Sequence, residues 1–234
     1  MIEILEITRK MKQGRTEPYL CKADDGKMYV VKGSNATNEG LVKELIVASL
    51  GEKFGLPIPP FQIAWVDDLL VEYNSFDLEA GYCFASLYQP NIQEITYNQL
   101  KEVNRQQLRD LFVFDYWIRN NDRNLTEHGG NPNFFKDQSS KDTFVLDHNL
   151  SFAPDFEVSD HLSQHVSSDS WGQLELLDRE TYTEKFKEAL EDIDSIIEAI
   201  PNDWLETYTT DTIETEIKVV LNKFLDDAFW EDIS

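Results

Sequence analysis

The sequence predicts an α+β protein with two lobes, a β-rich N-terminal lobe that contains one helix and a mostly helical C-terminal lobe. Residues 1–88 hold short alternating or apolar runs separated by turn signals, as strands do. One long apolar run with helical spacing interrupts them. Beyond residue 89 most apolar residues recur at helical spacing. We therefore expect an N-terminal lobe over 1–88 and a C-terminal lobe over 89–234.

The N-terminal lobe is expected to begin with three strands. Residues 1–7 alternate between apolar and polar side chains, as a half-buried strand does. Two further apolar runs, 18–24 and 27–32, flank Asp24-Asp25-Gly26, which is a hairpin turn signal.

One helix and more strands complete this lobe. The pattern predicts a helix over 39–54, which ends at Gly55 and a cluster of prolines. Residues 61–66 and 69–72 predict a second hairpin around an Asp-Asp pair, and 82–88 predict one more strand.

The C-terminal lobe is expected to be built around a buried helix. Residues 106–119 have helical spacing, and Asp115 interrupts an otherwise apolar stretch. Short strands are expected at 133–135 and 144–146. Residues 180–229 predict amphipathic helix interrupted at Pro201.

The chain is acidic, with a formal net charge of −23, and most of the acidic excess falls in residues 91–234. Such a surface repels phosphate backbones and anionic lipid, so we expect no nucleic-acid and no membrane partner. The charge favours a solvated face that keeps the protein in solution. Attraction to a basic protein partner or a basic substrate peptide is the alternative.

Composition places the chain among soluble cytoplasmic proteins. A hydrophobic fraction of 41% is too high for a disordered chain, and no apolar run approaches the ~20 residues that span a bilayer. The first residues lack the basic start and apolar core of a secretory signal. Cys21 and Cys83 lie in apolar, strand-like runs, so we expect reduced thiols in the core.

A lysine and a glutamate occupy positions where their elements should be apolar. Lys32 ends a predicted strand, and Glu44 lies on the inward side of the helix that follows. An inward carboxylate is costly unless a cation meets it. Kinases use a strand lysine and a helix glutamate to hold ATP phosphates. A lysine whose head reaches solvent beside a half-exposed glutamate is the alternative.

Polar loops then follow the buried helix and the two short strands. Asp122 and Asn131 lie in the first loop, and Asp147 ends the second strand. Phosphoryl transfer needs a carboxylate to orient the acceptor hydroxyl and hard oxygen ligands for Mg²⁺. Singly, these aspartates are ordinary turn formers. The order Lys, Glu, Asp, Asn, Asp is more specific and is the order found in kinases.

The sequence resembles the HipA-like kinases, which are related to phosphatidylinositol 3-/4-kinase-type kinases within the protein-kinase-like fold. The resemblance covers roughly residues 14–152, and the last ~80 residues match only as a generic helical lobe. Its most distinctive part is FDYWIRNNDRN (114–124), NPNFF (131–135) and LDHN (146–149).

The resemblance implies ATP and Mg²⁺ as ligands and a role for each candidate residue. Lys32 would contact the α- and β-phosphates, and Glu44 would anchor it. Asp122 would be the catalytic aspartate, and Asn131 and Asp147 would hold Mg²⁺.

The resemblance also implies nucleotide contacts from the N-terminal lobe. The loop that covers the phosphates would be Gly14, Arg15 and Thr16. The hinge that binds adenine would consist of Phe84, Ala85, Ser86, Leu87 and Tyr88.

The sequence departs from the kinase pattern in its loops. The usual glycine-rich phosphate loop is absent, and the 33–38 loop is a second candidate for phosphate cover. Kinases place the metal asparagine five residues after the aspartate, but position 127 is glutamate, and 127–130 resemble an insertion. Asn124 and Asn133 are therefore alternatives to Asn131. Arg123 would support the loop or a phosphate.

These residues predict an ATP-dependent phosphotransferase that acts on a hydroxyl acceptor, with Ser or Thr of a protein favoured. A small-molecule or lipid kinase of the same fold is one alternative, and an inactive nucleotide- or partner-binding pseudokinase is another. His161 and His165 have a spacing that can chelate Zn²⁺ on a helix. No cysteine or acidic ligand lies near them at motif spacing, so we predict no zinc site.

Overall fold

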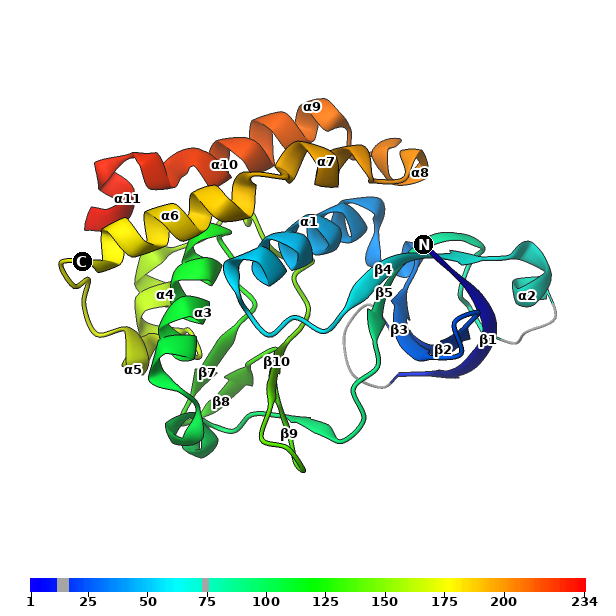
Figure 1. The fold of residues 1–234 in the computed structure, drawn as a ribbon, viewed down its shortest axis with the longest axis horizontal. Helices are drawn as coiled ribbons and strands as arrows, with labels where there is room; N and C mark the ends of the chain where they lie inside the picture. Colours follow the sequence, from blue (N-terminus) through cyan, green and yellow to red (C-terminus); the bar gives the residue numbers. More distant parts are fainter. Residues whose placement is uncertain (12–16, 73–75) are drawn as a thin grey trace.

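A closed β-barrel forms the N-terminal lobe of the computed structural model, which describes residues 1–11, 17–72 and 76–234 (Figure 1). The strands follow one another in the order β1-β2-β3-β5-β4, and a parallel pair between β1 and β4 closes the barrel. The barrel strands are β1 (Ile2–Lys10), β2 (Tyr19–Ala23), β3 (Met28–Lys32), β4 (Phe61–Val66) and β5 (Gly81–Leu87).

Both cysteines lie in the core of this barrel. Cys21 and Cys83 are free and buried, and burial raises the pKa of each thiol to about 12. The prediction of reduced core thiols is therefore confirmed for both residues.

The predicted helix of the N-terminal lobe is α1 (Asn38–Phe54). Thr37 caps it, since its hydroxyl accepts from the backbone N–H of Gly40 at 3.1 Å. Gly55 ends it at φ 95°, a left-handed conformation that glycine adopts without strain. Most of its side chains are buried, because β5 lies beside one part of the helix and α6, α7 and α8 cover another (Figure 1).

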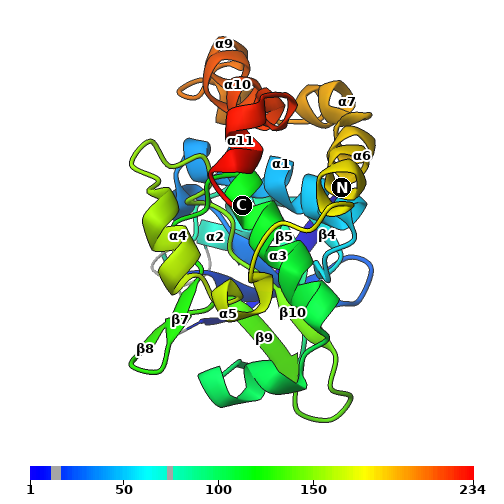
Figure 2. The ribbon, with the colours of Figure 1, turned by 90° about the vertical axis from the view of Figure 1, so that its left-hand side faces the viewer.

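The C-terminal lobe is mostly helical, as predicted, and α3 lies at its centre (Figure 2). Aromatic side chains fill its core: Trp117 of α3 stacks on Phe186 of α6, and Phe112 of α3 stacks on Trp171 of α5. Its α-helices are α3 (Arg105–Trp117), α4 (Val158–Gln164), α5 (Ser168–Trp171), α6 (Asp178–Leu190), α7 (Ile193–Glu198), α8 (Asn202–Leu205), α9 (Thr210–Thr212), α10 (Val219–Leu221) and α11 (Asp227–Glu231).

Short turns of other helix types join these elements. The 3₁₀ turns are η1 (Ser34–Ala36), η2 (Tyr97–Glu102) and η4 (Asn222–Leu225), and η3 (Ile213–Lys218) is π-helical.

Two small sheets lie beneath α3 (Figure 1). The three-stranded sheet has the order β10-β9-β6, and its two predicted strands, β9 and β10, are confirmed. A two-stranded hairpin, β7–β8, precedes β9. These strands are β6 (Ile92–Glu94), β7 (Asn124–Thr126), β8 (Gly129–Asn131), β9 (Phe134–Asp137) and β10 (Thr143–Val145).

The structure corrects one prediction in the N-terminal lobe. Residues 69–72 do not form the second strand of a hairpin, because they belong to a short helix, α2 (Asp68–Glu72). The Asp67 carboxylate accepts from the backbone N–H of Leu69 at 2.8 Å and so starts a helical turn. No helix in the described parts of the chain is long and apolar enough to cross a bilayer.

Candidate active site

One lysine joins two carboxylates between the lobes. Lys32 lies at the end of β3, Glu44 on α1 and Asp147 just after β10. The Lys32 Nζ lies 2.9 Å from Glu44 Oε2 and 2.8 Å from Asp147 Oδ1. The backbone N–H of His148 also donates to Glu44 Oε2, at 3.0 Å. The predicted pairing of Lys32 with Glu44 is present, and Asp147 joins it.

Charge pairing stabilises the ionised forms of these groups. Burial alone would lower the pKa of Lys32, but the Glu44 and Asp147 carboxylates outweigh it and raise the pKa. Burial alone would raise the pKa of Glu44, but the Lys32 ammonium and His148 lower it to about 2. The buried pair is therefore fully charged near neutral pH.

Asp147 is the most open member of this group. Its side chain is 23% exposed, against 11% for Lys32 and 5% for Glu44. Its backbone has φ 61°, an unusual value for a residue other than glycine. The second carboxylate oxygen, Oδ2, makes no hydrogen bond to the part of the chain that the structure describes. One oxygen thus pairs with Lys32 and the other remains available to a ligand.

Two asparagine amides hold the Asp122 carboxylate. The Nδ2 of Asn131 donates to Asp122 Oδ1 at 2.9 Å, and the Nδ2 of Asn133 donates to Asp122 Oδ2 at 3.1 Å. The backbone N–H of Asp122 donates to Asn120 Oδ1 at 3.0 Å. Asp122 is half-buried, and a hydrogen bond to each oxygen fixes the orientation of its carboxylate.

The insertion predicted at 127–130 lies in the β7–β8 hairpin. Asn124 pairs with Asn131 across the hairpin, and Asn124 Oδ1 accepts from the backbone N–H of Asn131 at 3.2 Å. A Cβ at Gly130 would lie only 2.4 Å from the carbonyl oxygen of Asn124, so only glycine fits. The hairpin thereby returns Asn131 to Asp122, nine residues later in the sequence.

The donor set fits a divalent cation. Asp147 offers a carboxylate oxygen, and Asn131 and Asn133 use their amide nitrogens toward Asp122, which leaves their Oδ1 atoms without a hydrogen bond to the described residues. Such hard oxygens suit Mg²⁺ or Mn²⁺. Asn124 Oδ1 already accepts a hydrogen bond inside the hairpin, so Asn124 is the weakest of the three candidate metal ligands.

Arg123 binds the protein itself and no open site. It is 1% exposed, and its Nε donates to Asp115 Oδ2 at 2.6 Å. Its NH1 group donates to the carbonyl oxygens of Asn133 and Leu146. Arg123 was expected to support the loop or to bind a phosphate, and these contacts match support of the loop.

The residues expected around adenine lie at the end of β5 and just after it. β5 lies between β3 and β4, so strand pairing surrounds Phe84, Ala85 and Ser86 on both sides. The backbone N–H of Tyr88, just after β5, still donates to the carbonyl oxygen of Met28 at 2.9 Å. The chain leaves the barrel after this bond and pairs with β9 from Ile92 onward. The expected phosphate loop, Gly14, Arg15 and Thr16, lies outside the described residues.

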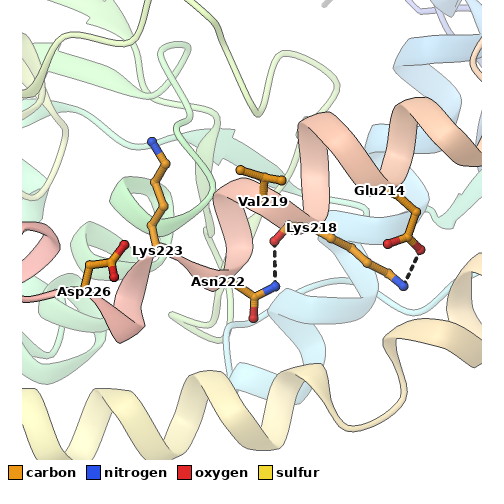
Figure 3. Close-up of a pocket in the computed structure, with 6 residues that line it drawn as sticks. All are labelled: Glu214, Lys218, Val219, Asn222, Lys223 and Asp226. Carbon is orange, nitrogen blue, oxygen red and sulfur yellow. Dashed lines mark hydrogen bonds and ion pairs between the residues drawn. The ribbon is translucent and has the colours of Figure 1, made fainter.

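Of two surface cavities, one lies away from the candidate residues and the other lies beside the loop of Asp122. A cavity of about 510 Å³ lies on the C-terminal helical segment and contains none of the candidate residues (Figure 3). Its Lys218 is paired with Glu214 and with Asp194. A second cavity, of about 410 Å³, lies between the β7–β8 hairpin and the β6–η2 segment, next to the loop of Asp122. Glu94, Tyr97 and Glu127 are among its lining residues.

Sequence reasoning missed the residues that support the loop. Asp115, Asn120 and His165 all hydrogen bond within a buried network around Arg123. Asp115 carried a signal, because it is the one charge in the apolar stretch of α3. His165 carried none, and the structure places it and His161 in the core. The described residues contain no cluster of three or more His, Cys, Asp or Glu side chains arranged to hold a metal.

Comparisons with known proteins give a family and similar folds. A family model described as HipA-like kinase matches residues 4–233. Among solved structures, the Helicobacter pylori proinflammatory kinase CtkA is similar, with a TM-score of 0.56, 13% identity, and coverage of 95% of this chain and 96% of that chain.

The Golgi casein kinase, solved with Mn/ADP bound, is also similar, with a TM-score of 0.52 and 12% identity over 96% of this chain and 73% of that chain. At such identities these likenesses show the fold alone. No curated protein matches the sequence. The match over nearly the whole length shows that the chain belongs to the HipA-like kinase family, a membership that implies phosphotransferase chemistry with ATP and a divalent metal.

Proposed function

We propose that this chain transfers the γ-phosphoryl group of ATP to a hydroxyl acceptor, Ser or Thr of a protein. The observation that carries the proposal is the contact of Lys32 with both Glu44 and Asp147. Lys32 and Glu44 are 12 residues apart, and Asp147 lies 115 residues after Lys32, yet the three side chains meet. Burying charged groups costs folding free energy, and kinases use such a lysine with its carboxylates to bind ATP phosphates.

The nucleotide side of the site follows from the same contacts. Lys32 would bind the α- and β-phosphates while Glu44 keeps its ammonium in place. Asp147 and Asn131 would hold Mg²⁺, with Asn133 as the alternative to Asn131, and the bound ion would neutralise charge on the phosphates. The similar Golgi casein kinase has been solved with Mn/ADP, which supports a nucleotide bound with a divalent metal.

The acceptor side depends on Asp122. Its carboxylate would accept a hydrogen bond from the attacking hydroxyl and orient the oxygen toward the γ-phosphorus. The amides of Asn131 and Asn133 fix the carboxylate at both oxygens, which limits the rotation that would misalign the acceptor. We infer that Asp122 is the catalytic aspartate.

The groove beside the β7–β8 hairpin supports a protein as the acceptor. It borders the catalytic loop, and Glu94 and Glu127 line it. Carboxylates and the acidic surface of the chain repel phosphate-bearing acceptors such as membrane lipids and nucleic acids. They attract a peptide with basic residues near its Ser or Thr.

Thermal unfolding with ATP and Mg²⁺ tests nucleotide binding, and transfer of labelled phosphate from [γ-³²P]ATP tests catalysis. A ligand at 100 times its Kd adds about 2.7 kcal/mol to the stability of the chain. We expect wild type to show a Mg²⁺-dependent shift and autophosphorylation or peptide phosphorylation. Asp147→Asn should lose both, and Asp122→Asn should keep the shift and lose the transfer.

Asp142→Asn is the matched control, because Asp142 is exposed on the β9–β10 turn and contacts no candidate residue. Full transfer activity in Asp147→Asn would overturn the assignment. Nucleotide binding by wild type without any turnover would instead favour the pseudokinase alternative.

A further inference from the structure

A single guanidinium links the segments that carry the candidate chemistry. Arg123 directly follows Asp122, and its NH1 group donates to the carbonyl oxygens of Asn133 and Leu146. Asn133 holds the Asp122 carboxylate, and Leu146 immediately precedes Asp147. The position of Arg123 therefore sets the spacing between the catalytic loop and the metal-binding segments.

Asp115 holds this guanidinium in place. Its side chain is fully buried, and its Oδ2 accepts from Arg123 Nε at 2.6 Å. Its Oδ1 accepts from Asn120 Nδ2 at 2.9 Å, and Asn120 Oδ1 in turn accepts from the backbone N–H of Asp122 at 3.0 Å. One carboxylate thus orients the residues on both sides of Asp122.

A histidine also contacts the Asp115 carboxylate. His165 follows α4, and its Nε2 lies 2.9 Å from Asp115 Oδ2. Its Nδ1 accepts from the backbone N–H of Ser167 at 3.1 Å. The residue is 3% exposed, and this burial lowers the pKa of the imidazole, so the ring is neutral. Because Nδ1 accepts from Ser167, the single ring proton lies on Nε2. His165 therefore donates to Asp115.

The backbone around His165 is also fixed to the catalytic loop. The N–H of Val166 donates to the carbonyl oxygen of Arg123 at 3.2 Å, and His165 forms a β-bridge with Asn124. These backbone contacts fix the position of the imidazole. A shift of residues 165–171 would therefore displace Asp115 and, through its hydrogen bonds, Asp122.

We propose that His165 is a positioning residue for phosphoryl transfer, which acts by donating to Asp115 so that Asp115 keeps Arg123 and Asn120 on either side of Asp122. This inference rests on the proposed function and adds a residue from a segment that the proposed function does not use. His165 does not touch the substrate, so its loss should change turnover more than nucleotide affinity.

His161 provides a matched control. It is also buried, its Nε2 bonds to the carbonyl oxygen of Phe112 at 3.0 Å, and its ring lies against Phe112 as that of His165 does. It makes no hydrogen bond to Asp115. A leucine at either position removes a buried imidazole from the same core, and only the change at 165 removes the hydrogen-bond donor to Asp115.

The test compares His165→Leu, His165→Gln and His161→Leu by MgATP turnover and MgADP binding. We expect His165→Leu to lower kcat by roughly 10- to 100-fold, the loss typical of a supporting hydrogen bond around an active site, with the Kd for MgADP within threefold of wild type. His165→Gln restores an N–H donor and should recover most of kcat. His161→Leu should keep kcat within threefold.

Amide hydrogen exchange makes the test independent of catalysis. Residues 120–124 should exchange faster in His165→Leu than in wild type and His161→Leu. Unchanged kcat and exchange in His165→Leu, or equal effects in His161→Leu, would overturn the inference. A wild-type protein without turnover would count against the proposed function alone, and the exchange comparison would then decide the role of His165.

Discussion

The molecule contains two ion-pair networks that differ in their access to solvent. Lys32, Glu44 and Asp147 meet between the lobes, and the Asp147 side chain is 23% exposed there. Arg123 and Asp115 meet beneath the loop that carries Asp122, and neither side chain is accessible. The open network can exchange a protein partner for a ligand, whereas the sealed network can only hold its geometry. The two should therefore respond differently to mutation, pH and salt.

The largest effect is expected from breaking the sealed network. Asp115→Ala leaves the Arg123 guanidinium buried without its counter-ion, which should cost about 3–5 kcal/mol of folding stability. Lys32→Met should cost less, because water can reach Asp147 and the backbone N–H of His148 still supports Glu44. Guanidinium chloride unfolding of both variants measures this difference. Equal losses would show that the two networks are not distinct.

Lys32 and Glu44 of the open network should act together in ligand binding. Lys32→Met and Glu44→Gln should each weaken binding of MgATP, and the double variant should be little worse than Lys32→Met alone. The coupling between the two changes should be about 1–3 kcal/mol, since Glu44 acts by holding Lys32. Isothermal titration calorimetry of the four proteins gives this value. Additive losses would mean that Glu44 does not act through Lys32.

Acid should reduce stability in two ranges of pH. Burial lowers the pKa of His161 and His165, so the unfolded chain binds protons below about pH 6.5 while the folded chain does not, and stability falls. Glu44 has a pKa of about 2 in the folded chain, so its contribution is present above about pH 4.5 and is lost as pH falls toward 2. Urea unfolding between pH 7.5 and 3 should show both ranges.

Variants separate the two ranges. His161→Gln should reduce the loss of stability in the upper range, to which His165 also contributes, and leave the lower range unchanged. Glu44→Gln should reduce the loss in the lower range, to which Asp115 also contributes because Arg123 and His165, against the effect of burial, lower the pKa of its carboxyl. A single range that neither variant alters would contradict the assignment of these groups.

The smallest effect is expected at the surface. Arg179 and Asp227 form an ion pair whose side chains are 46% and 78% exposed. Because water and salt screen such a pair, Arg179→Ala should change stability by no more than about 0.5 kcal/mol, and less at high salt. Chemical unfolding at low and high NaCl concentrations measures the difference. A loss comparable to that of Asp115→Ala would remove the distinction between exposed and sealed pairs.

The sequence predicted the residues of the open network better than those of the sealed one. Lys32 and Glu44 were recognisable because each is charged at a position where its strand or helix faces inward. Asp115 was visible as a break in an apolar stretch, but its partners were not. His165 lies outside any periodic element, so nothing in its neighbourhood marked it as a donor to Asp115.

Loop geometry limited the remaining predictions. The choice among three asparagines depends on how the β7–β8 hairpin returns the chain, and both Asn131 and Asn133 reach Asp122. The strand expected at 69–72 was wrong because an Asp-Asp pair can begin a helix as well as a hairpin turn, and Asp67 caps α2. Neither outcome follows from residue type alone.

The packing of α1 has a consequence for the order of folding. This helix carries Glu44 and is part of the first half of the chain, yet α6, α7 and α8 cover much of its apolar surface. On a ribosome, α1 would leave the exit tunnel more than 120 residues before α6. It would have to wait, with its apolar face uncovered, until the last quarter of the protein was synthesised. We therefore expect nascent chains that stop before α6 to bind chaperones or aggregate.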